Sequence, residues 1–343
     1  MIRTKVTVLL LGMAALLPTA AFTGKASGGA SLQVSAVGVV GFTVADMDRA
    51  LAFYTGVLPF VKVTDRDVSG RPYELLSGIF GARSRIATLR LGSEEIELTE
   101  FLAPKGRPIP PDVRANDRSF QHMAIVVSDI GRAYSRLRER GIEYASTGPQ
   151  RLPDWNRGAA GISAFYFRDP DRHFLEIISF PNDKGAVKWH GTHTDLFLGI
   201  DHTAIVVDDT NVSLRFYHDT LGFQVAGESE NYDTEQEHLN NVFGARLRIT
   251  ALRAGKGPGI ELLEYLAPRD GRPAPADLRA NDIAHWQTTL VADGLDSLVT
   301  LARDHRLSLV SPGTVDTATS VIGFRTGSLT RDPDGHGLRF VAP

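Results

Sequence analysis

The sequence predicts an α+β protein built from four modules, each with the strand and helix order β-α-β-β-β. Two observations support this prediction. First, the 343-residue chain is a tandem duplication, since VFGARLRITALR (residues 242–253) is similar in sequence to IFGARSRIATLR (residues 79–90). A repeat with a period of roughly 160 residues is a duplicated domain and not a solenoid unit. Second, each copy consists of two similar halves, and every half opens on a short apolar strand that ends in aspartate.

The opening strands and the helices after them follow one pattern four times. The segments that follow the strands, such as residues 46–58 and 129–141, carry apolar residues at helical spacing, and the aspartate before each can cap the helix. Short runs separated by Gly, Pro and Asp then predict further strands in each module. The four opening strands are VVGFTVAD (39–46), HMAIVVSD (122–129), HTAIVVDD (202–209) and WQTTLVAD (286–293).

The composition narrows the class of protein. Hydrophobic residues make up 43% of the chain and charged residues 22%, as in soluble globular proteins. The formal net charge of -3 gives no reason to expect a nucleic-acid partner or an anionic membrane partner. Because the chain has no cysteine, disulfides, thiolate metal sites and cysteine nucleophiles are excluded. We expect a small-molecule substrate, and a monomer or a homodimer.

The N-terminus has the layout of a secretory signal peptide over residues 1–26. Arg3 and Lys5 precede an apolar run from Val6 to Leu17, and small residues follow. The run is too short for a confident transmembrane span. We therefore expect export to the periplasm or the exterior, with no membrane association once the segment is removed. A retained anchor or an unstructured tail is the alternative.

Further motifs suggest a family. A helix with Phe53–Tyr54 follows the first strand, LGF stands at residues 221–223, and the modules close on RDPDRHFLEI (168–177) and RDPDGHGLRF (331–340). This arrangement resembles the vicinal oxygen chelate superfamily, which includes glyoxalase I, extradiol dioxygenases and the fosfomycin and bleomycin resistance proteins. The resemblance implies two tandem domains of the glyoxalase/bleomycin-resistance/dioxygenase type, residues 35–182 and 198–343, joined by a linker over residues 183–197.

The resemblance also implies a metal site. In this superfamily two modules enclose one divalent metal ion, and each module supplies ligands near the head of its first strand and on its last strand. Imidazole and carboxylate ligands suit Fe, Mn, Co, Ni or Zn, so we expect one such ion. The second and third modules carry a His–Glu pair at these positions: His122, Glu176, His202 and Glu261.

The other two modules lack a complete ligand set. The first has Val39 and Glu97 at these positions, and the fourth has Trp286 and Arg339. If the modules pair within each copy, one site has three ligands and the other has two. If the second module pairs with the third, one site holds all four and the other site is lost. We favour the second arrangement, because it separates one intact site from one lost site.

Four further side chains are candidates for roles near the metal. Tyr166 precedes Glu176 much as in the extradiol dioxygenase signature, where a tyrosine acts beside the metal, although it could also be packed within the sheet. His238 is a candidate acid–base group, and Asn240 and Asn241 are candidates for substrate binding, because the second copy is polar here where the first is not. The alternative is a histidine on a helix surface with a capping asparagine.

Three loops receive an interpretation from their composition. Trp155, in RLPDWNRG (151–158), could form a lid or an aromatic wall of a pocket. The linker segment KWHGTH (188–193) indicates interdomain packing. The RAND stretches at residues 114–117 and 279–282 occur in both copies, which favours a structural turn.

Three functions fit these residues. The first is a metal-dependent enzyme of the glyoxalase, lyase or isomerase type, with the metal as Lewis acid on neighbouring substrate oxygens and Glu176 or Glu261 moving a proton. The second is an Fe(II) extradiol-type dioxygenase that uses His122, His202 and Glu176, with Tyr166 nearby. The third is a non-catalytic protein that binds a small molecule, as resistance proteins do.

Overall fold

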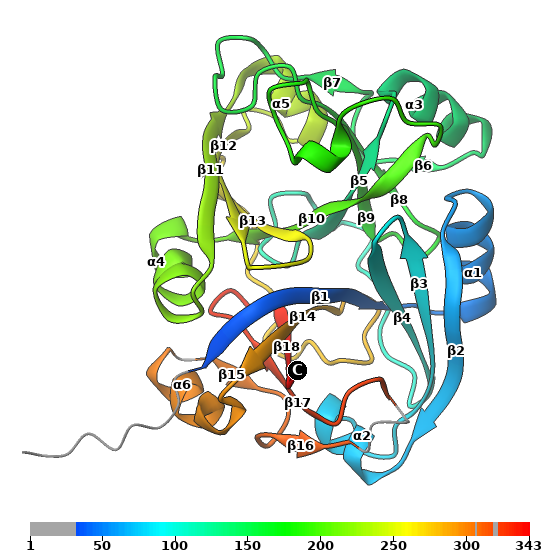
Figure 1. The fold of residues 1–343 in the computed structure, drawn as a ribbon, viewed down its shortest axis with the longest axis vertical. Helices are drawn as coiled ribbons and strands as arrows, with labels where there is room; N and C mark the ends of the chain where they lie inside the picture. Colours follow the sequence, from blue (N-terminus) through cyan, green and yellow to red (C-terminus); the bar gives the residue numbers. More distant parts are fainter. Residues whose placement is uncertain (1–31, 306, 318–321) are drawn as a thin grey trace, which may run out of the picture.

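Two nine-stranded mixed sheets organise residues 32–305, 307–317 and 322–343, which are the residues that the computed structural model describes (Figure 1). The expected signal peptide over residues 1–26 lies outside them. Strands and a few short helices alternate in each module, so the predicted α+β class is confirmed. Within the described residues, no helix is long and apolar enough to cross a membrane.

The first sheet joins the first module to the fourth. Its strand order is β15-β17-β18-β14-β1-β4-β3-β2, with β16 beside β17, and β1 pairs antiparallel with β14. The strands are β1 (Gln33–Thr43), β2 (Val61–Ser69), β3 (Arg83–Leu91), β4 (Glu94–Ala103), β14 (Trp286–Asp293), β15 (Ser308–Leu309), β16 (Val315–Asp316), β17 (Thr326–Arg331) and β18 (Gly337–Val341).

The second sheet joins the second module to the third, which confirms the favoured pairing. Its order is β11-β12-β13-β10-β5-β9-β8-β6, with β7 beside β8, and β5 pairs antiparallel with β10. The strands are β5 (Gln121–Val127), β6 (Glu143–Tyr144), β7 (Gln150–Arg151), β8 (Ser163–Arg168), β9 (Phe174–Ser179), β10 (Phe197–Val207), β11 (Gln224–Asn231), β12 (Arg246–Arg253) and β13 (Gly259–Ala267).

Short helices connect the strands, and three begin at the predicted aspartate caps. Asp46, Asp129 and Asp209 each accept hydrogen bonds from backbone N–H groups of the first turn. In the fourth module Gly294, one residue after Asp293, takes the capping position, and the helical segment begins at Leu295. The helices are α1 (Met47–Gly56), α2 (Arg71–Ser77), α3 (Ile130–Glu139), η1 (Val187–Trp189), α4 (Thr210–Leu214), η2 (Arg215–Thr220), α5 (Asp233–Asn240), η3 (Leu295–Ser297) and α6 (Leu298–Asp304).

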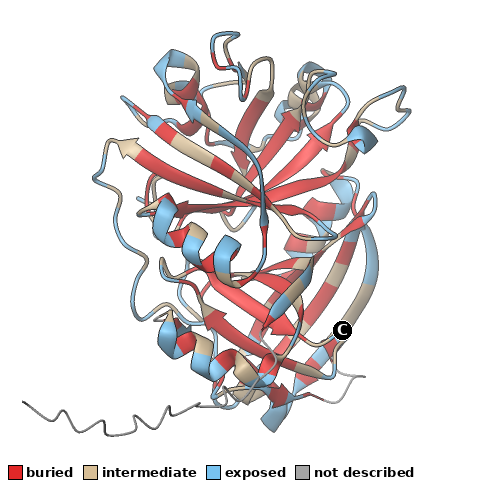
Figure 2. Ribbon diagram, turned by 60° about the vertical axis from the view of Figure 1, so that its left-hand side comes forward, coloured by how far each residue is buried: buried red, intermediate tan, exposed pale blue. Residues whose placement is uncertain are grey.

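Alternate residues of the central strands face different hydrophobic clusters. On β5, Met123 and Ile125 join a cluster with α1 and α3 of the same copy, whereas Ala124 and Val126 join a cluster enclosed by the second sheet. This follows from the two-residue period of a strand. The central strands are therefore buried on both faces, with partly exposed helices and exposed loops outside them (Figure 2). His122 lies on the same face as Ala124.

The two motifs of the modules bind one another. The buried hydroxyl of Tyr54, in the first FY pair, donates a hydrogen bond to Oδ2 of Asp169 in the first RDPD segment at 3.0 Å. Its counterpart in the second copy, Tyr217, donates to Oδ2 of Asp332 at 2.8 Å. The contact ties the helix of one module to the last hairpin of the next, so these motifs hold each copy together.

The RAND stretches form structural turns that connect the copies, as expected. Oδ2 of Asp117 accepts a hydrogen bond from the backbone N–H of Arg114 and another, at 2.6 Å, from Arg272 of the other copy. Asp282 makes the equivalent bonds with Arg279 and Arg107. Burial alone would raise the pKa of Asp117, but the bonds from Arg272 and the backbone hold that pKa below its usual value.

We predict that Asp117→Asn lowers the free energy of unfolding at pH 7 by about 1.5–3 kcal/mol, the contribution typical of hydrogen bonds to a charged group. Because the folded-state pKa is lowered, the stabilisation is complete above the unfolded pKa of about 4 and is lost as the pH falls through the folded value. Urea unfolding from pH 7 to pH 3 should show the difference from the parent shrinking. Asp112→Asn, at an exposed partner of Arg272, is the control, and a pH-independent difference would contradict this account.

Candidate metal centre

Strand register brings the two predicted histidines together. In the pairing of β5 with β10, His122 lies opposite Ala204 and His202 lies opposite Ala124. The parallel neighbours β9 and β13 place Glu176 level with Ala124 and Glu261 level with Ala204. Because residues two apart on a strand share a face, all four predicted ligands point to the same side of the second sheet.

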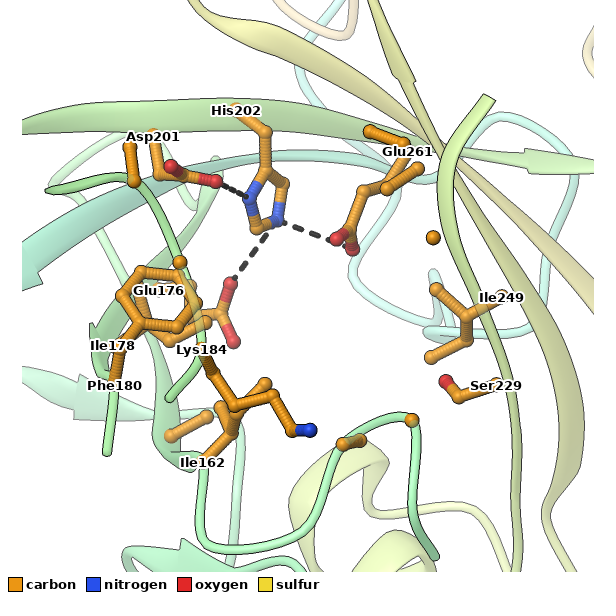
Figure 3. Close-up of a pocket in the computed structure, with 18 of the residues that line it drawn as sticks. Ile162, Glu176, Ile178, Phe180, Lys184, Asp201, His202, Ser229, Ile249 and Glu261 are labelled. Carbon is orange, nitrogen blue, oxygen red and sulfur yellow. Dashed lines mark hydrogen bonds and ion pairs between the residues drawn. The ribbon is translucent and has the colours of Figure 1, made fainter. Parts of the chain in front are cut away.

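Nitrogen and oxygen atoms of these side chains converge. Nε2 of His122 lies 3.1 Å from Oε2 of Glu176. Nε2 of His202 lies 3.6 Å from that same oxygen and 3.3 Å from Oε2 of Glu261. Figure 3 shows the two glutamates on either side of His202. We call His122, Glu176, His202 and Glu261 the four-residue cluster.

A hydrogen-bond network fixes the orientation of His202. Its Nδ1 donates to Oδ2 of the neighbouring Asp201 at 3.0 Å, because an ionised carboxylate can only accept. Asp201 also accepts from Nε1 of Trp189 at 2.8 Å and from the guanidinium of Arg253 at 2.6 Å. Asp201 thus fixes one proton on Nδ1. In the neutral imidazole, the form that binds a metal, the lone pair of Nε2 then faces the glutamates, which is how metal-binding histidines are held in proteins.

The electrostatics of the cluster favour a cation. Burial would lower the pKa of His202, but the carboxylates of Glu261, Asp201 and Glu176 outweigh it and raise that pKa to about 9. Burial raises the pKa of Glu261, and the nearby Glu176 and Asp201 carboxylates add to this rise. Two carboxylates that repel one another in a buried site are stabilised by a positive charge between them.

The residues fit a divalent metal ion. Both ring nitrogens of His122 and Nε2 of His202 are buried and make no hydrogen bond. A buried polar atom without a partner is costly, and coordination would remove that cost. The ligand atoms of His122, Glu176 and His202 all lie within 4.8 Å of one another. Two imidazoles and carboxylates form a donor set for Zn or for Mn, Fe, Co and Ni.

The cluster opens into a cavity of about 760 Å³, a volume within the usual range for small-molecule sites. Glu176, His202 and Glu261 line it, and Glu261 is the most accessible ligand, with 24% of its side chain exposed. Apolar side chains form much of the remaining wall, and Figure 3 shows four of them: Ile162, Ile178, Phe180 and Ile249.

Tyr166 lies beside the four-residue cluster. Its ring centroid is 4.8 Å from that of His122, and the residue lines the cavity although it is only 5% exposed. Burial, together with the Glu176 carboxylate, raises the pKa of the phenol well above its usual value. The hydroxyl therefore remains protonated at neutral pH and is a potential hydrogen-bond donor toward the cavity.

Two of the predicted residues on α5 do not belong to the site. His238 is exposed and does not line the cavity, so the structure does not support an acid–base role for it. Asn241 is also exposed and ends the helix in the left-handed conformation, with φ of 53°. Asparagine tolerates this conformation better than most residues. This placement agrees with the alternative interpretation, a histidine on the helix surface with a capping asparagine.

Asn240 supports the cavity wall and is not exposed to the cavity. Its amide oxygen accepts from Gln236, and its NH₂ group donates to the hydroxyl of Tyr265 at 2.6 Å. Gln236 in turn accepts from Asn231 at 3.0 Å, and these two amides do line the cavity. Asn231 and Gln236, and not Asn240, thus present amide groups to the cavity.

Trp155 lies on the outer side of the loop that follows β7. The indole is 46% exposed and packs on Tyr232 of the third module, with ring centroids 4.3 Å apart. Trp155 itself does not line the cavity, whereas Gly158 and Ala159 of the same loop do. Trp155 thus holds the loop against the third module. Of the two roles expected for it, a lid or an aromatic wall, the wall is not observed.

The linker contributes residues that the sequence reasoning missed. Lys188 binds the buried carboxylate of Glu94, from the first sheet, at 2.5 Å. The same carboxylate accepts the backbone N–H of Ile200, two residues before His202, at 3.0 Å. A Cβ at Gly199 would lie 2.3 Å from Glu94, so glycine permits this approach. The predicted interdomain packing of KWHGTH is confirmed for Trp189, which is buried.

A family model described as the Glyoxalase/Bleomycin resistance protein/Dioxygenase superfamily matches residues 36–177 and again residues 199–340. The chain belongs to this superfamily. The predicted family and its two tandem domains are confirmed.

Individual proteins resemble the chain to different extents. It is 34% identical over 153 residues to a 2-epi-5-epi-valiolone epimerase from Actinomyces sp, an alignment that covers 43% of this chain and 80% of that protein. A variant of glyoxalase I from Zea mays covers 91% of this chain and 92% of its own, with TM-score 0.58 and 16% identity. A putative dioxygenase from Bacillus subtilis covers 90% and 86%, with TM-score 0.54 and 13% identity. At these identities the two structures show a similar fold alone.

The first sheet has a position equivalent to that of the four-residue cluster, but only Glu97 there is a residue of a ligand type. Register places Glu97 level with Gly41, and Arg339 level with Thr289, so the histidine positions are Val39 and Gln287. The predicted counterpart Trp286 is one residue too early. In this module Gly294, and not Asp293, takes the capping position before the helical segment.

A protein cation takes the place of a metal in this lost site. The Arg339 guanidinium lies 2.6 Å from Oε1 of Glu97, and Gln287 donates to the same oxygen at 3.3 Å. Both charged side chains are at most 7% exposed, and the neighbouring cavity measures only about 30 Å³. The ion pair therefore neutralises the buried carboxylate and leaves no room for a substrate.

We predict that Asp201→Asn weakens metal binding about 10–100-fold, the usual cost of losing a partner that orients a ligand. The amide no longer fixes the proton on Nδ1 of His202 as a carboxylate does. Competition with a chromophoric chelator measures the affinity. Glu228→Gln changes a carboxylate that lines the same cavity without touching the cluster and should leave the affinity unchanged. Equal affinities for Asp201→Asn and the parent would contradict the assignment.

Arg339→Met should lower the free energy of unfolding by about 3–5 kcal/mol, because it leaves the Glu97 carboxylate buried and unpaired. Adding Glu97→Gln should recover much of this loss, which urea unfolding can measure. Arg246→Met, which breaks an exposed ion pair with Glu230, should cost at most about 1 kcal/mol. A double variant no more stable than Arg339→Met would refute the buried-charge explanation.

Proposed function

We propose that the protein is a divalent-metal-dependent isomerase that acts on a small substrate with neighbouring oxygens. The observation that carries this proposal is the four-residue cluster at one end of a cavity of about 760 Å³. The similarity to an epimerase, over 43% of the chain, favours an isomerase over a lyase. A bound divalent ion would act as a Lewis acid on a substrate oxygen.

The residues of the chain divide the remaining work. His122, His202, Glu176 and Glu261 would hold the ion. Glu176 and Glu261 lie on opposite sides of His202 (Figure 3), so one carboxylate can remove a proton from a carbon beside a carbonyl and the other can return a proton to the opposite face. Glu261 is the more accessible of the two carboxylates, with 24% of its side chain exposed against 5% for Glu176, so it is the better placed to meet the substrate. The phenol of Tyr166 can donate a hydrogen bond to substrate oxygen.

The proposal predicts that the purified protein holds about one divalent ion per chain. His122→Ala and His202→Ala should each lower metal content strongly, because each removes a ligand. With the metal present, the parent should exchange a C–H proton of an α-hydroxy ketone for deuterium, followed by NMR, and both variants should lose this exchange. His238→Ala, at the exposed histidine of α5, is the control. Unchanged metal content in both ligand variants would rule out the site.

One observation favours a second function. His122, Glu176 and His202 form the most compact part of the cluster, and two histidines with one carboxylate are the ligand set of Fe(II) oxygenases. Tyr166 stands beside this triad. Oxygen consumption with catechols and Fe(II) distinguishes this function from an isomerase, which consumes no oxygen. Binding without either reaction would indicate a binding protein.

A further inference from the structure

A lysine of the linker extends into the cavity. Lys184 lies between β9 and η1 and lines the cavity of the four-residue cluster. Figure 3 shows its ammonium group directed into the open part of the cavity, with His202, Glu176 and Glu261 grouped on another side. With 23% of its side chain exposed, the lysine is partly shielded from water. A cation in such a position interacts more strongly with an opposite charge than one on the open surface.

The backbone around Lys184 is well defined by contacts. Its N–H donates to the carbonyl of Pro181 at 3.0 Å. The next residue, Gly185, has φ of 75°, and a Cβ there would lie 2.6 Å from the ring of Phe180. Phe180 itself lines the cavity. This tight turn directs the lysine side chain into the cavity.

The charge of Lys184 is poorly compensated by the protein. Two other cations that line the cavity are bound to buried carboxylates: Arg253 lies 2.6 Å from Asp201, and Lys188 lies 2.5 Å from Glu94. Lys184 has a longer contact of 3.7 Å with Asp183, whose side chain is 77% exposed. An exposed pair of this kind contributes little.

The other charged groups around the cavity do not neutralise the charge of Lys184. Glu228 is bound to Arg248 at 3.0 Å, and a divalent ion would neutralise the two glutamates of the cluster. Lys256 also lines the cavity, but it stands on an exposed turn between β12 and β13, where water and salt screen its charge. An anionic group is therefore the natural partner of Lys184.

We propose that Lys184 binds a carboxylate or phosphate group of the substrate, so that the protein acts on an anionic substrate whose neighbouring oxygens face the four-residue cluster. The placement of the substrate's neighbouring oxygens at the four-residue cluster rests on the proposed function. Lys184 is thus a specificity-determining residue, and it selects an acidic substrate over a neutral one of the same shape.

Calorimetric titration of the full-length, Zn²⁺-supplemented protein with matched probes tests this proposal. Dihydroxyacetone phosphate and 5-hydroxy-4-oxopentanoate carry a hydroxy ketone with a distant phosphate or carboxylate. Dihydroxyacetone and 1-hydroxy-2-butanone are their neutral counterparts. At least one anionic probe should bind about tenfold more tightly than its counterpart, as expected for a charge-assisted contact. The probe that binds more tightly identifies the source of the oxyanion.

Variants assign the preference to one side chain. Lys184→Gln should remove the preference for the anionic probe, whereas Lys184→Arg should retain it. Lys62→Gln, at an exposed lysine on β2, is the control and should behave as the parent. A parent without the preference, or a Lys184→Gln variant that keeps it, would overturn the proposal.

The same samples separate this proposal from the proposed function. Their metal content is measured, and the titrations are repeated after the metal has been removed with a chelator. A protein that binds no metal would refute the metal-dependent function, while the comparison of Lys184→Gln with the parent would still decide the role of Lys184. Loss of the preference in Lys184→Gln at full metal content supports both.

Discussion

The antiparallel pairing of β5 with β10 is the interaction on which the rest of the structure depends. It joins the second half of one copy to the first half of the other, and its register sets His122 and His202 diagonally across one face. The pairing of β1 with β14 repeats this arrangement in the first sheet. Each sheet is thus shared between copies, while two hydrophobic clusters stay largely within single copies. Neither copy alone contains all the residues of the four-residue cluster.

The two equivalent positions show two solutions for a buried carboxylate. In the second sheet, the two glutamates lie against two histidines whose Nε2 atoms make no hydrogen bond, an arrangement that favours a bound cation. In the first sheet, Arg339 brings the positive charge to Glu97 from within the chain. The first sheet still serves the cluster, because Glu94 binds the backbone just before His202.

The sequence predicted the modules, because strand heads and strand periods are local patterns. The four candidate ligand positions followed from the resemblance to the superfamily, and the favoured module pairing followed from their uneven distribution. It predicted Trp286 in place of Gln287, since the extra position before the helix at Gly294 cannot be seen without the backbone. His238 was placed in the site because it is polar, but the orientation of α5 turns it outward. The role of Asp201 depends on Trp189 and Arg253, which only the folded chain brings together. Lys184 was hidden in a linker for the same reason.

The central claim is that the four-residue cluster binds a divalent ion. X-ray absorption spectroscopy of the Zn²⁺-loaded protein tests it most directly, since it reports the atoms around the metal. The account predicts two imidazole nitrogens at about 2.0–2.1 Å and carboxylate oxygens at about 2.0–2.2 Å, with one imidazole lost in His122→Ala and in His202→Ala. A shell that contains no imidazole, or one that is the same in both variants, would contradict it.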